Sequence, residues 1–484
     1  MPVIVIVADG ARPDVLLDAM QRGVVPALSS LRDEGGMHTI TTVFPSVTGP
    51  AYAPFIMGRF PGPVGLPGLR WYDRTREAIK FPGHSRSYVG PELRLVDTDI
   101  DAHAPTIFEL AKSSLAALNV IGRGLARNQR LGNSLWFALT TGRTHFTGNV
   151  KGWLAIDRAI ASQVARDIKL KHPDFVFAAL TGVDKTSHSR GHTGPHVDSA
   201  LEIVDSLVSE IRADAESRGK WEDTHVWVVS DHGHSAVRQH ENLVGVIRAM
   251  GFRTIAHPFV FLRRPEAAVM VSGNAMAHIY LDLERTERPS VLDLGERWRK
   301  IESQLLARDS VDLMILPQGN GRCEIHGSRG RGHAVLEWGG GKFHYTPASG
   351  DPIGVGLQTN LTEDETYDVT LDSDYPDSLL QIARLSDSPR SGEIILSASR
   401  DWDFRSKYEP IPHVSSHGAL HREHMLVPLL TNKPLAVQPK RTVDIMPSAL
   451  DALGLPVPAG LDGISFLTAT ATADEEHGEV DQST

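Results

Sequence analysis

Short apolar runs separated by amphipathic stretches dominate the hydrophobic pattern of this chain. Val3–Ala8 and Phe175–Leu180 are wholly apolar, and residues 225–230 are nearly so. Runs of this kind are typical of parallel strands that are buried on both faces of a sheet. Two further strands are predicted at residues 39–44 and 423–430.

Between these strands, apolar residues recur three and four positions apart, as on the buried face of a helix. Helices are predicted from Pro13 onward, near residues 50–58, and over residues 26–34, 195–213 and 443–453. Strands that alternate with helices indicate an α/β fold, here a doubly wound, mostly parallel sheet.

The organisation along the chain suggests one interrupted core. Residues 1–239 and 410–468 are assigned to the α/β core, and residues 240–409, with short strands, Gly-rich turns and acidic loops, to an inserted α+β cap domain. Residues 469–484 are expected to form a disordered acidic tail. Residues 62–100 are rich in Gly and Pro and are expected to be a long loop or lid outside the core.

Composition narrows the functional class. The 484 residues carry a net charge of -10, which argues against a binder of nucleic-acid polymers, although a bound metal would still allow an anionic substrate. The single cysteine, Cys323, excludes an internal disulfide and a multi-thiolate zinc site. No basic leader and no run of about 18 apolar residues is seen, so a cytoplasmic protein without a membrane partner is expected.

Three aspartates follow the ends of predicted buried strands. Asp9 and Asp231 come directly after their strands, and Asp184 follows its strand by a short turn. Ligands of open α/β sheets bind beyond the carboxyl ends of the strands, so all three are expected at one rim. Each alone could equally be a helix cap or turn residue.

Histidines accompany these aspartates at ligand spacing. His188 follows Asp184 by four residues, His232 follows Asp231 directly, and His417 lies in a Ser-His-Gly turn. Three Asp and three His suffice for two metal sites with three protein ligands each, leaving open positions for water or substrate. Imidazole and carboxylate ligands suit zinc, with manganese, iron or cobalt as alternatives, and a pair of such ions suits phosphoryl transfer.

The candidate nucleophile is Thr48, which lies between an apolar strand and the helix-like stretch that begins near Pro50. At a helix N-terminus, free amides and the positive end of the dipole favour an anion. Metal coordination would activate the threonine hydroxyl. Thr48 could also be a plain helix cap, and the two roles are compatible.

Taken together, these motifs resemble the alkaline phosphatase superfamily, and most closely its nucleotide pyrophosphatase/phosphodiesterase (type I phosphodiesterase) branch. The motifs are Val7-Ala8-Asp9-Gly10, Phe44-Pro45-Ser46-Val47-Thr48, Met57-Gly58-Arg59-Phe60-Pro61, Asp184-x-x-x-His188, Ser230-Asp231-His232-Gly233 and Ser416-His417-Gly418. The resemblance covers roughly residues 1–60, 174–235 and 413–465.

The resemblance implies an alkaline phosphatase-like core and a two-metal mechanism. One metal would be held by Asp9, Asp231, His232 and the oxygen of Thr48, and the other by Asp184, His188 and His417. Thr48 would attack phosphorus, and water would cleave the resulting phospho-threonine.

Departures from the family pattern leave the substrate open. The asparagine that usually follows the nucleophile is missing, and Lys185 could supply charge to the same phosphate oxygen or could simply be solvated. Arg70, Trp71 and Tyr72 could stack on or grip a leaving group, or could pack as a lid on their own core. Further histidines near the motifs are expected to support the ligands or lie at the surface: His192, His196, His234, His240, His421 and His424.

The sequence therefore predicts a two-metal hydrolase of small-molecule phosphoric esters, with diester and pyrophosphate bonds preferred to monoesters. A phosphonoacetate-type C–P hydrolase and a phosphomonoesterase are the alternatives within this chemistry. A protein whose metals only brace a binding surface is the non-enzymatic alternative. A sulfatase is disfavoured because Cys323 lies far from the strand–helix junction, and the oligomeric state is left open.

Overall fold

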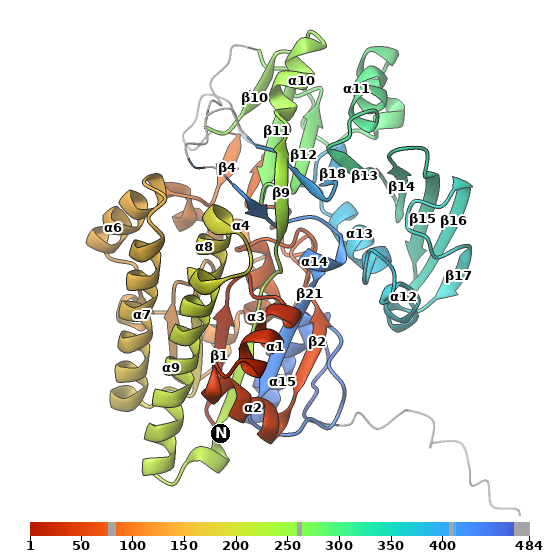
Figure 1. Ribbon diagram of the computed structural model, residues 1–484. Helices are drawn as coiled ribbons and strands as arrows, with labels where there is room; N and C mark the ends of the chain where they lie inside the picture. The colour runs from red at the N-terminus through yellow and green to blue at the C-terminus, as the bar shows by residue number, and fades with distance from the viewer. Residues whose placement is uncertain (76–83, 259–263, 406–410, 412, 469–484) are drawn as a thin grey trace, which may run out of the picture.

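The computed structural model describes residues 1–75, 84–258, 264–405, 411 and 413–468 (Figure 1). Two sheets organise this part of the chain, one in each of the two bodies visible in Figure 1. The body that contains the N-terminus holds the sheet with flanking helices, and the other body holds a larger, mostly antiparallel sheet.

The first sheet has seven strands among the described residues. Their order is β2 (Met37–Thr41), β21 (Leu426–Thr431), β8 (His225–Val229), β1 (Val3–Ala8), β7 (Phe175–Leu180), β5 (Ser114–Ala117) and β6 (Arg130–Leu131). The five strands from β8 to β6 are parallel, and β21 and β2 add an antiparallel edge. The α/β fold class with a mostly parallel sheet is confirmed.

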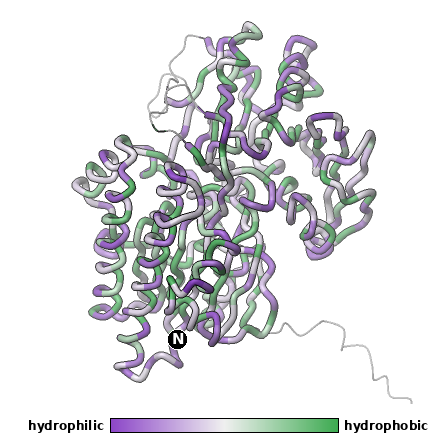
Figure 2. The backbone as a smooth tube through the Cα atoms, in the orientation of Figure 1, coloured by the Kyte–Doolittle hydropathy of each residue, from purple (hydrophilic) through white to green (hydrophobic). Residues whose placement is uncertain are grey.

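Alternate residues of β1 enter opposite cores, because successive side chains of a strand point to opposite faces. Val3, Val5 and Val7 join the cluster under α3 (Ala53–Met57), α5 (Ile107–Leu110) and α15 (Ile445–Leu453). The intervening residues of β1 join the cluster covered by α1 (Pro13–Gln21), α2 (Pro26–Gly35), α7 (Val150–Lys171) and α9 (Pro195–Ser217). Helices thus cover both faces of the sheet, and in Figure 2 hydrophobic and hydrophilic residues alternate along these helices.

Further elements lie outside the seven-stranded sheet and its covering helices. They are α4 (Val96–Asp99), α6 (Leu135–Phe146), α8 (Gly182–Arg190), α14 (Arg422–Met425), the 3-10 turns Pro50–Tyr52, Pro91–Leu95, Arg127–Gln129, Trp221–Asp223 and Thr442–Asp444, and the strand pair β3 (Arg70–Tyr72) and β4 (Ser85–Ser87). A three-stranded sheet joins β9 (Ser235–His240) to β19 (Asp401–Asp403) and β20 (Ser415–Ser416).

The second large sheet has nine strands among the described residues. In order they are β10 (Thr254–Ala256), β11 (Ala267–Ser272), β12 (Met276–Leu281), β18 (Ile394–Ala398), β13 (Val311–Gly319), β14 (Arg322–Gly327), β15 (Gly332–Gly339), β16 (Lys342–Gly350) and β17 (Gln358–Leu361). Its helices are α10 (Leu243–Ala249), α11 (Glu296–Leu306), α12 (Glu363–Thr370) and α13 (Ser378–Ser386), with a 3-10 turn at Val291–Asp293. The sheet lies within the range expected for the cap, while the domain limits at 240 and 410 stay a prediction.

Two predicted strands are shifted in the structure. The strand expected at 39–44 is β2 at Met37–Thr41, because the N–H groups of Thr42 and Phe44 donate to Met425 and Gln381 rather than to a sheet neighbour. The strand expected at 423–430 begins only at Leu426, because the residues before it form α14.

The expectation that residues 62–100 lie outside the core is wrong for several residues of this segment that the structure describes. Trp71 and Tyr72 on β3 are buried in the cluster beneath the parallel sheet, and Arg86 on β4 is fully buried. Arg86 pairs with Asp99, so a salt bridge anchors the segment internally. The acidic tail, 469–484, lies outside the described residues. Among the helices that are described, none has the length and apolar character needed to span a bilayer.

Candidate active site

The three aspartates meet at the carboxyl ends of three neighbouring strands of the parallel sheet. Asp9 follows β1, Asp231 follows β8, and Asp184 lies on α8 just after β7. All three carboxylates are fully buried, and the backbone N–H of Asp184 donates to the carbonyl of Asp9 at 2.9 Å. Neighbouring parallel strands deliver their carboxyl ends to the same rim, which explains why residues so far apart in sequence lie together.

Helix α8 carries both members of the Asp-x-x-x-His motif on one face. Nε2 of His188 lies 3.1 Å from Oδ1 of Asp184, and Nζ of Lys185 lies 2.5 Å from Oδ2. The start of the helix is fixed by Asp157 of α7, which accepts hydrogen bonds from the N–H groups of Thr181 and Gly182 at 3.1 and 2.6 Å. A buried carboxylate of α7 therefore sets the position of the helix that bears these groups.

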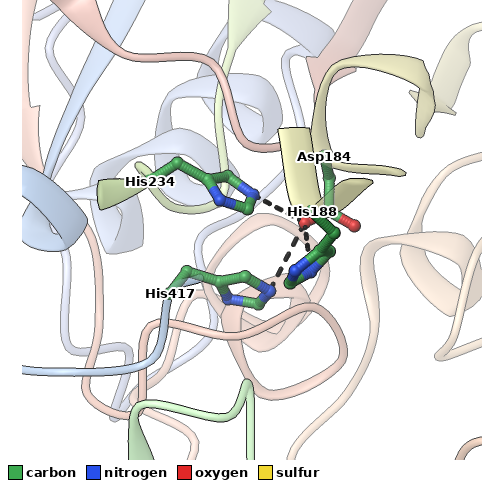
Figure 3. Close-up of side chains that lie close together, drawn as sticks. All are labelled: Asp184, His188, His234 and His417. Carbon is green, nitrogen blue, oxygen red and sulfur yellow. Dashed lines mark hydrogen bonds and ion pairs between the residues drawn. The ribbon is translucent and has the colours of Figure 1, made fainter. Parts of the chain in front are cut away.

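Three imidazoles surround a single oxygen of Asp184 (Figure 3). Nε2 of His234, His188 and His417 lies 2.7, 3.1 and 3.4 Å from Oδ1, respectively. Together the four side chains form a group whose potential ligand atoms all lie within 4.8 Å of one another. His188 and His417 were predicted for this place, and His234 was not.

The outer nitrogens of the predicted histidines face backbone carbonyls. Nδ1 of His188 lies 3.0 Å from the carbonyl of Ser415, and Nδ1 of His417 lies 2.9 Å from that of Ser46. A carbonyl only accepts, so Nδ1 must donate, and a neutral ring then directs the lone pair of Nε2 into the group. This arrangement is the one that metal-binding histidines adopt.

A second group forms around Asp9 and His232. Nε2 of His232 lies 3.3 Å from Oδ1 of Asp9 and 3.6 Å from Oδ2 of Asp231. Oγ1 of Thr48 lies 3.2 Å from Nε2 of His232 and 3.4 Å from both oxygens of Asp9. The rings of His232 and His417 stack at 3.6 Å, so the two groups are direct neighbours.

The electrostatics of the combined groups favour bound cations. Burial, reinforced by the carboxylates of Asp231 and Asp184, raises the pKa of Asp9 well above its ordinary value. Burial also raises the pKa of Asp231, whose Oδ2 has no hydrogen-bond partner among the described residues. Burial acts in the same direction on Asp184, but the ammonium group of Lys185 beside it holds that pKa well below its ordinary value.

An unpaired buried carboxylate oxygen is costly unless it binds a proton, a donor or a cation. Here several carboxylates converge with imidazole lone pairs in a site that excludes solvent. This donor set fits divalent cations that accept nitrogen and oxygen ligands.

Arg70, Trp71 and Tyr72 are not members of either of these two groups. Trp71 is fully buried and its indole N–H donates to Oη of Tyr88 at 3.0 Å, while Tyr72 packs against His84. The structure therefore favours the packing interpretation for these two rings. Arg70 is partly exposed and lines a cavity with His257, Phe404 and Arg405, among others.

The other histidines lie around the groups rather than within them. The ring of His424 is buried and accepts from the N–H of Ala419, His240 contacts Asp403, and His421 contacts Glu423. His196 contacts the carbonyl of Gly191, and His192 is partly exposed. His234 is the one of these histidines whose ring lies in the group around Asp184. Its position two residues after His232, beyond a Gly, was the available signal.

Comparison with protein families gives one match over most of the chain. The family model described as type I phosphodiesterase / nucleotide pyrophosphatase matches residues 3–420. The chain belongs to this family. It is therefore a hydrolase of the nucleotide pyrophosphatase/phosphodiesterase type, within the alkaline phosphatase superfamily, as the motifs predicted. Comparison with curated protein sequences found no match.

Solved structures show the same fold at low sequence identity. Phosphonoacetate hydrolase from Sinorhizobium meliloti, in complex with phosphonoacetate, is 16% identical with a TM-score of 0.58, covering 94% of this chain and 96% of that one. Mouse ectonucleotide pyrophosphatase/phosphodiesterase 5 is 14% identical with a TM-score of 0.55, covering 95% and 96%. The human protein of the same name is 11% identical with a TM-score of 0.56 and the same coverage.

Proposed function

We propose that this member of the family hydrolyses phosphodiester or pyrophosphate bonds of small molecules, with Thr48 as the nucleophile. The observation that carries the proposal is the placement of Oγ1 of Thr48 within 3.4 Å of both His232 and Asp9, beside a second group built on Asp184. A structure of the mouse relative in complex with AMP is of an inactive variant in which a threonine is replaced by alanine.

The residues divide between two cations, which we propose to be zinc. Asp9, Asp231, His232 and Thr48 would hold one, and Asp184, His188 and His417 would hold the other. When bound, the two ions would supply Lewis acidity toward the oxygens of an in-line displacement at phosphorus.

The reaction of this chain begins at Thr48. Its Oγ1 forms a bond to phosphorus while the bond from phosphorus to the leaving oxygen breaks, and the hydroxyl proton passes to the carboxylate of Asp9 at 3.4 Å. The product of this step is a phosphorylated Thr48 that retains the second ester group. Water then forms a new bond to phosphorus and the bond to Oγ1 breaks. Oγ1 recovers its proton from Asp9, and the proton that the water loses protonates the leaving oxygen released in the first step.

Lys185 and Arg70 are the proposed substrate contacts outside the ligand set. The ammonium group of Lys185 is partly exposed and pairs with Asp184. Burial acts to lower its pKa, but the carboxylates of Asp184 and Asp9 outweigh this and raise it, so the group is a cation at neutral pH. We assign it to a phosphoryl oxygen, the role left open by the missing asparagine. Arg70, at its cavity, would bind an anionic part of the leaving group.

Residues 240–409 are proposed as the cap that selects the substrate. The loop after β11 reaches the site, since the carbonyl of Gly273 accepts from Oγ of Ser416 at 2.9 Å and the N–H of Ala275 donates to the carbonyl of His417 at 3.0 Å. A C–P hydrolase is the second candidate, because the fold is shared with phosphonoacetate hydrolase at a TM-score of 0.58.

The test is a substrate panel with and without a chelator. We expect the metal-loaded protein to hydrolyse bis(4-nitrophenyl) phosphate faster than 4-nitrophenyl phosphate, with activity lost in chelator and restored by zinc. Release of inorganic phosphate from phosphonoacetate at a higher kcat/KM would instead establish the C–P hydrolase. Diester hydrolysis that persists without metal would contradict the proposal.

A further inference from the structure

We propose that His234 is a fourth protein ligand of the cation at Asp184, so that this site consists of one carboxylate and three imidazoles. The inference rests on the two-metal site proposed above and changes its ligand count. His234 lies on the loop between β8 and β9, and its Nε2 approaches Oδ1 of Asp184 more closely than that of either predicted histidine does.

The hydrogen bond on the far side of the ring fixes its tautomer. Oγ of Ser415 has one proton, which it donates to the carbonyl of Ser235 at 2.8 Å. The same oxygen lies 3.1 Å from Nδ1 of His234 and can therefore only accept from it. Nδ1 consequently carries the hydrogen of the neutral imidazole, and Nε2 presents its lone pair to the carboxylate.

Two acceptors then face each other at hydrogen-bond distance. The lone pair of Nε2 and the carboxylate oxygen lie 2.7 Å apart in a fully buried environment. The same conflict recurs at His188 and His417, whose Nδ1 atoms donate to carbonyls and whose Nε2 atoms face the same oxygen. One cation among the four groups turns every one of these repulsive contacts into a coordination bond.

The ring of His234 is held where a ligand is needed. A Cβ atom at Gly10 would lie only 2.9 Å from Cδ2 of this ring and 3.1 Å from Asp184, so a side chain at Gly10 would displace both. On the backbone side, Nη1 of Arg12 donates to the carbonyl of His234 at 3.0 Å. The first loop after β1 therefore supports His234 and Asp184 together.

A fourth protein ligand changes the role of this site. Zinc sites with four protein ligands are closed, whereas catalytic sites keep a position open. Water or a substrate oxygen would have to enter here as a fifth ligand. At the neighbouring site the fourth protein ligand would be the oxygen of Thr48, the group proposed to react with the substrate.

The deciding experiment is zinc X-ray absorption spectroscopy on the full-length, zinc-loaded protein and on His234→Ala. Wild type is expected to show four imidazoles shared by two zinc ions, from His188, His232, His234 and His417, and the variant one fewer. His424→Ala is the matched control, because His424 is equally buried but bonds to Ala419 and Ser235 instead. This control is expected to retain all four.

Zinc affinity gives an independent measurement. Losing a ligand should weaken one of the two sites more than 100-fold, whereas losing an outer hydrogen-bond partner costs about 10–100-fold. Three imidazoles in wild type, with an unchanged count in His234→Ala, would overturn the inference and leave His234 as a residue that only orients Asp184. The spectrum does not depend on turnover. Failure of the diester assay would therefore contradict the proposed function without affecting this result, and a wild type that binds no zinc would contradict both.

Discussion

Asp157 offers a test of how the fold positions the metal ligands. This residue of α7 is 1% exposed, and its two oxygens accept the N–H groups of Thr181 and Gly182 where α8 begins. Helix α8 in turn carries Asp184, Lys185 and His188. Asp157→Ala would leave both N–H groups buried without an acceptor.

The size of the effect follows from these two bonds. An unsatisfied buried donor costs about 1–3 kcal/mol, so the variant should lose about 2–6 kcal/mol of unfolding free energy. Asp157→Asn should recover about half of the loss, since its amide oxygen still accepts one N–H group. Because α8 would no longer be fixed at its first turn, zinc affinity at the Asp184 site should also fall, on the order of 10-fold or more.

Urea unfolding and zinc titration would measure both effects. The matched control is Asp167→Ala on the same helix, whose carboxylate forms an i,i+4 pair with the half-exposed Lys171. Such pairs contribute about 0.3–0.5 kcal/mol, so little change is expected. If Asp157→Ala unfolds at the same urea concentration and binds zinc as tightly as Asp167→Ala, the hydrogen bonds to Asp157 do not hold α8 in place.

Three further predictions concern stability and the loop between the histidines. Burial lowers the pKa of His225 to about 4 from 6.5, so protonation of this group should lower the unfolding free energy by about 3 kcal/mol as the pH falls from 6.5 to 4. The unfolding free energy of His225→Phe should therefore depend less on pH over this range, and an equal dependence would contradict this. Trp71→Ala should cost about 3–5 kcal/mol in urea unfolding because the indole is fully buried, whereas a change confined to KM would restore its substrate role. Gly233→Ala would place a Cβ 2.1 Å from the carbonyl of Glu423, so zinc binding measured by titration should weaken about 10–100-fold, and unchanged binding would show that the loop can shift.

The parallel sheet and the meeting place of most candidate ligands could be predicted because the signals are local. Val3–Ala8 and Phe175–Leu180 are strands with the predicted limits, since burial on both faces leaves a continuous apolar run. The residue that follows such a run lies at the rim of the sheet whatever the rest of the chain does. Asp9, Asp231 and the Asp184–His188 pair could therefore be identified from sequence.

The remaining features depend on contacts between distant segments. His234 lies in the group around Asp184 because β9 pairs with β20, which places Ser415 against its ring, and no pattern near His234 reveals that pairing. The Gly and Pro content of residues 62–69 indicates turns before β3 but carries no information about the burial of Trp71. Likewise, β18 of the nine-stranded sheet pairs with β12 and β13, which lie far before it in the sequence, so its neighbours are fixed by packing rather than by a local pattern.

Trapping the covalent intermediate would show whether a pair of cations makes Thr48 reactive toward phosphorus. Zinc-loaded enzyme would be mixed with bis(4-nitrophenyl) phosphate, quenched in acid and analysed by peptide mass spectrometry, alongside Thr48→Ser and Thr48→Ala. We expect a 4-nitrophenylphosphoryl group on the peptide at Thr48, a slower but detectable adduct in Thr48→Ser, and none in Thr48→Ala. Turnover in Thr48→Ala should fall on the order of 10³-fold, equivalent to about 4 kcal/mol. Full turnover by Thr48→Ala, or an adduct on another residue, would contradict it.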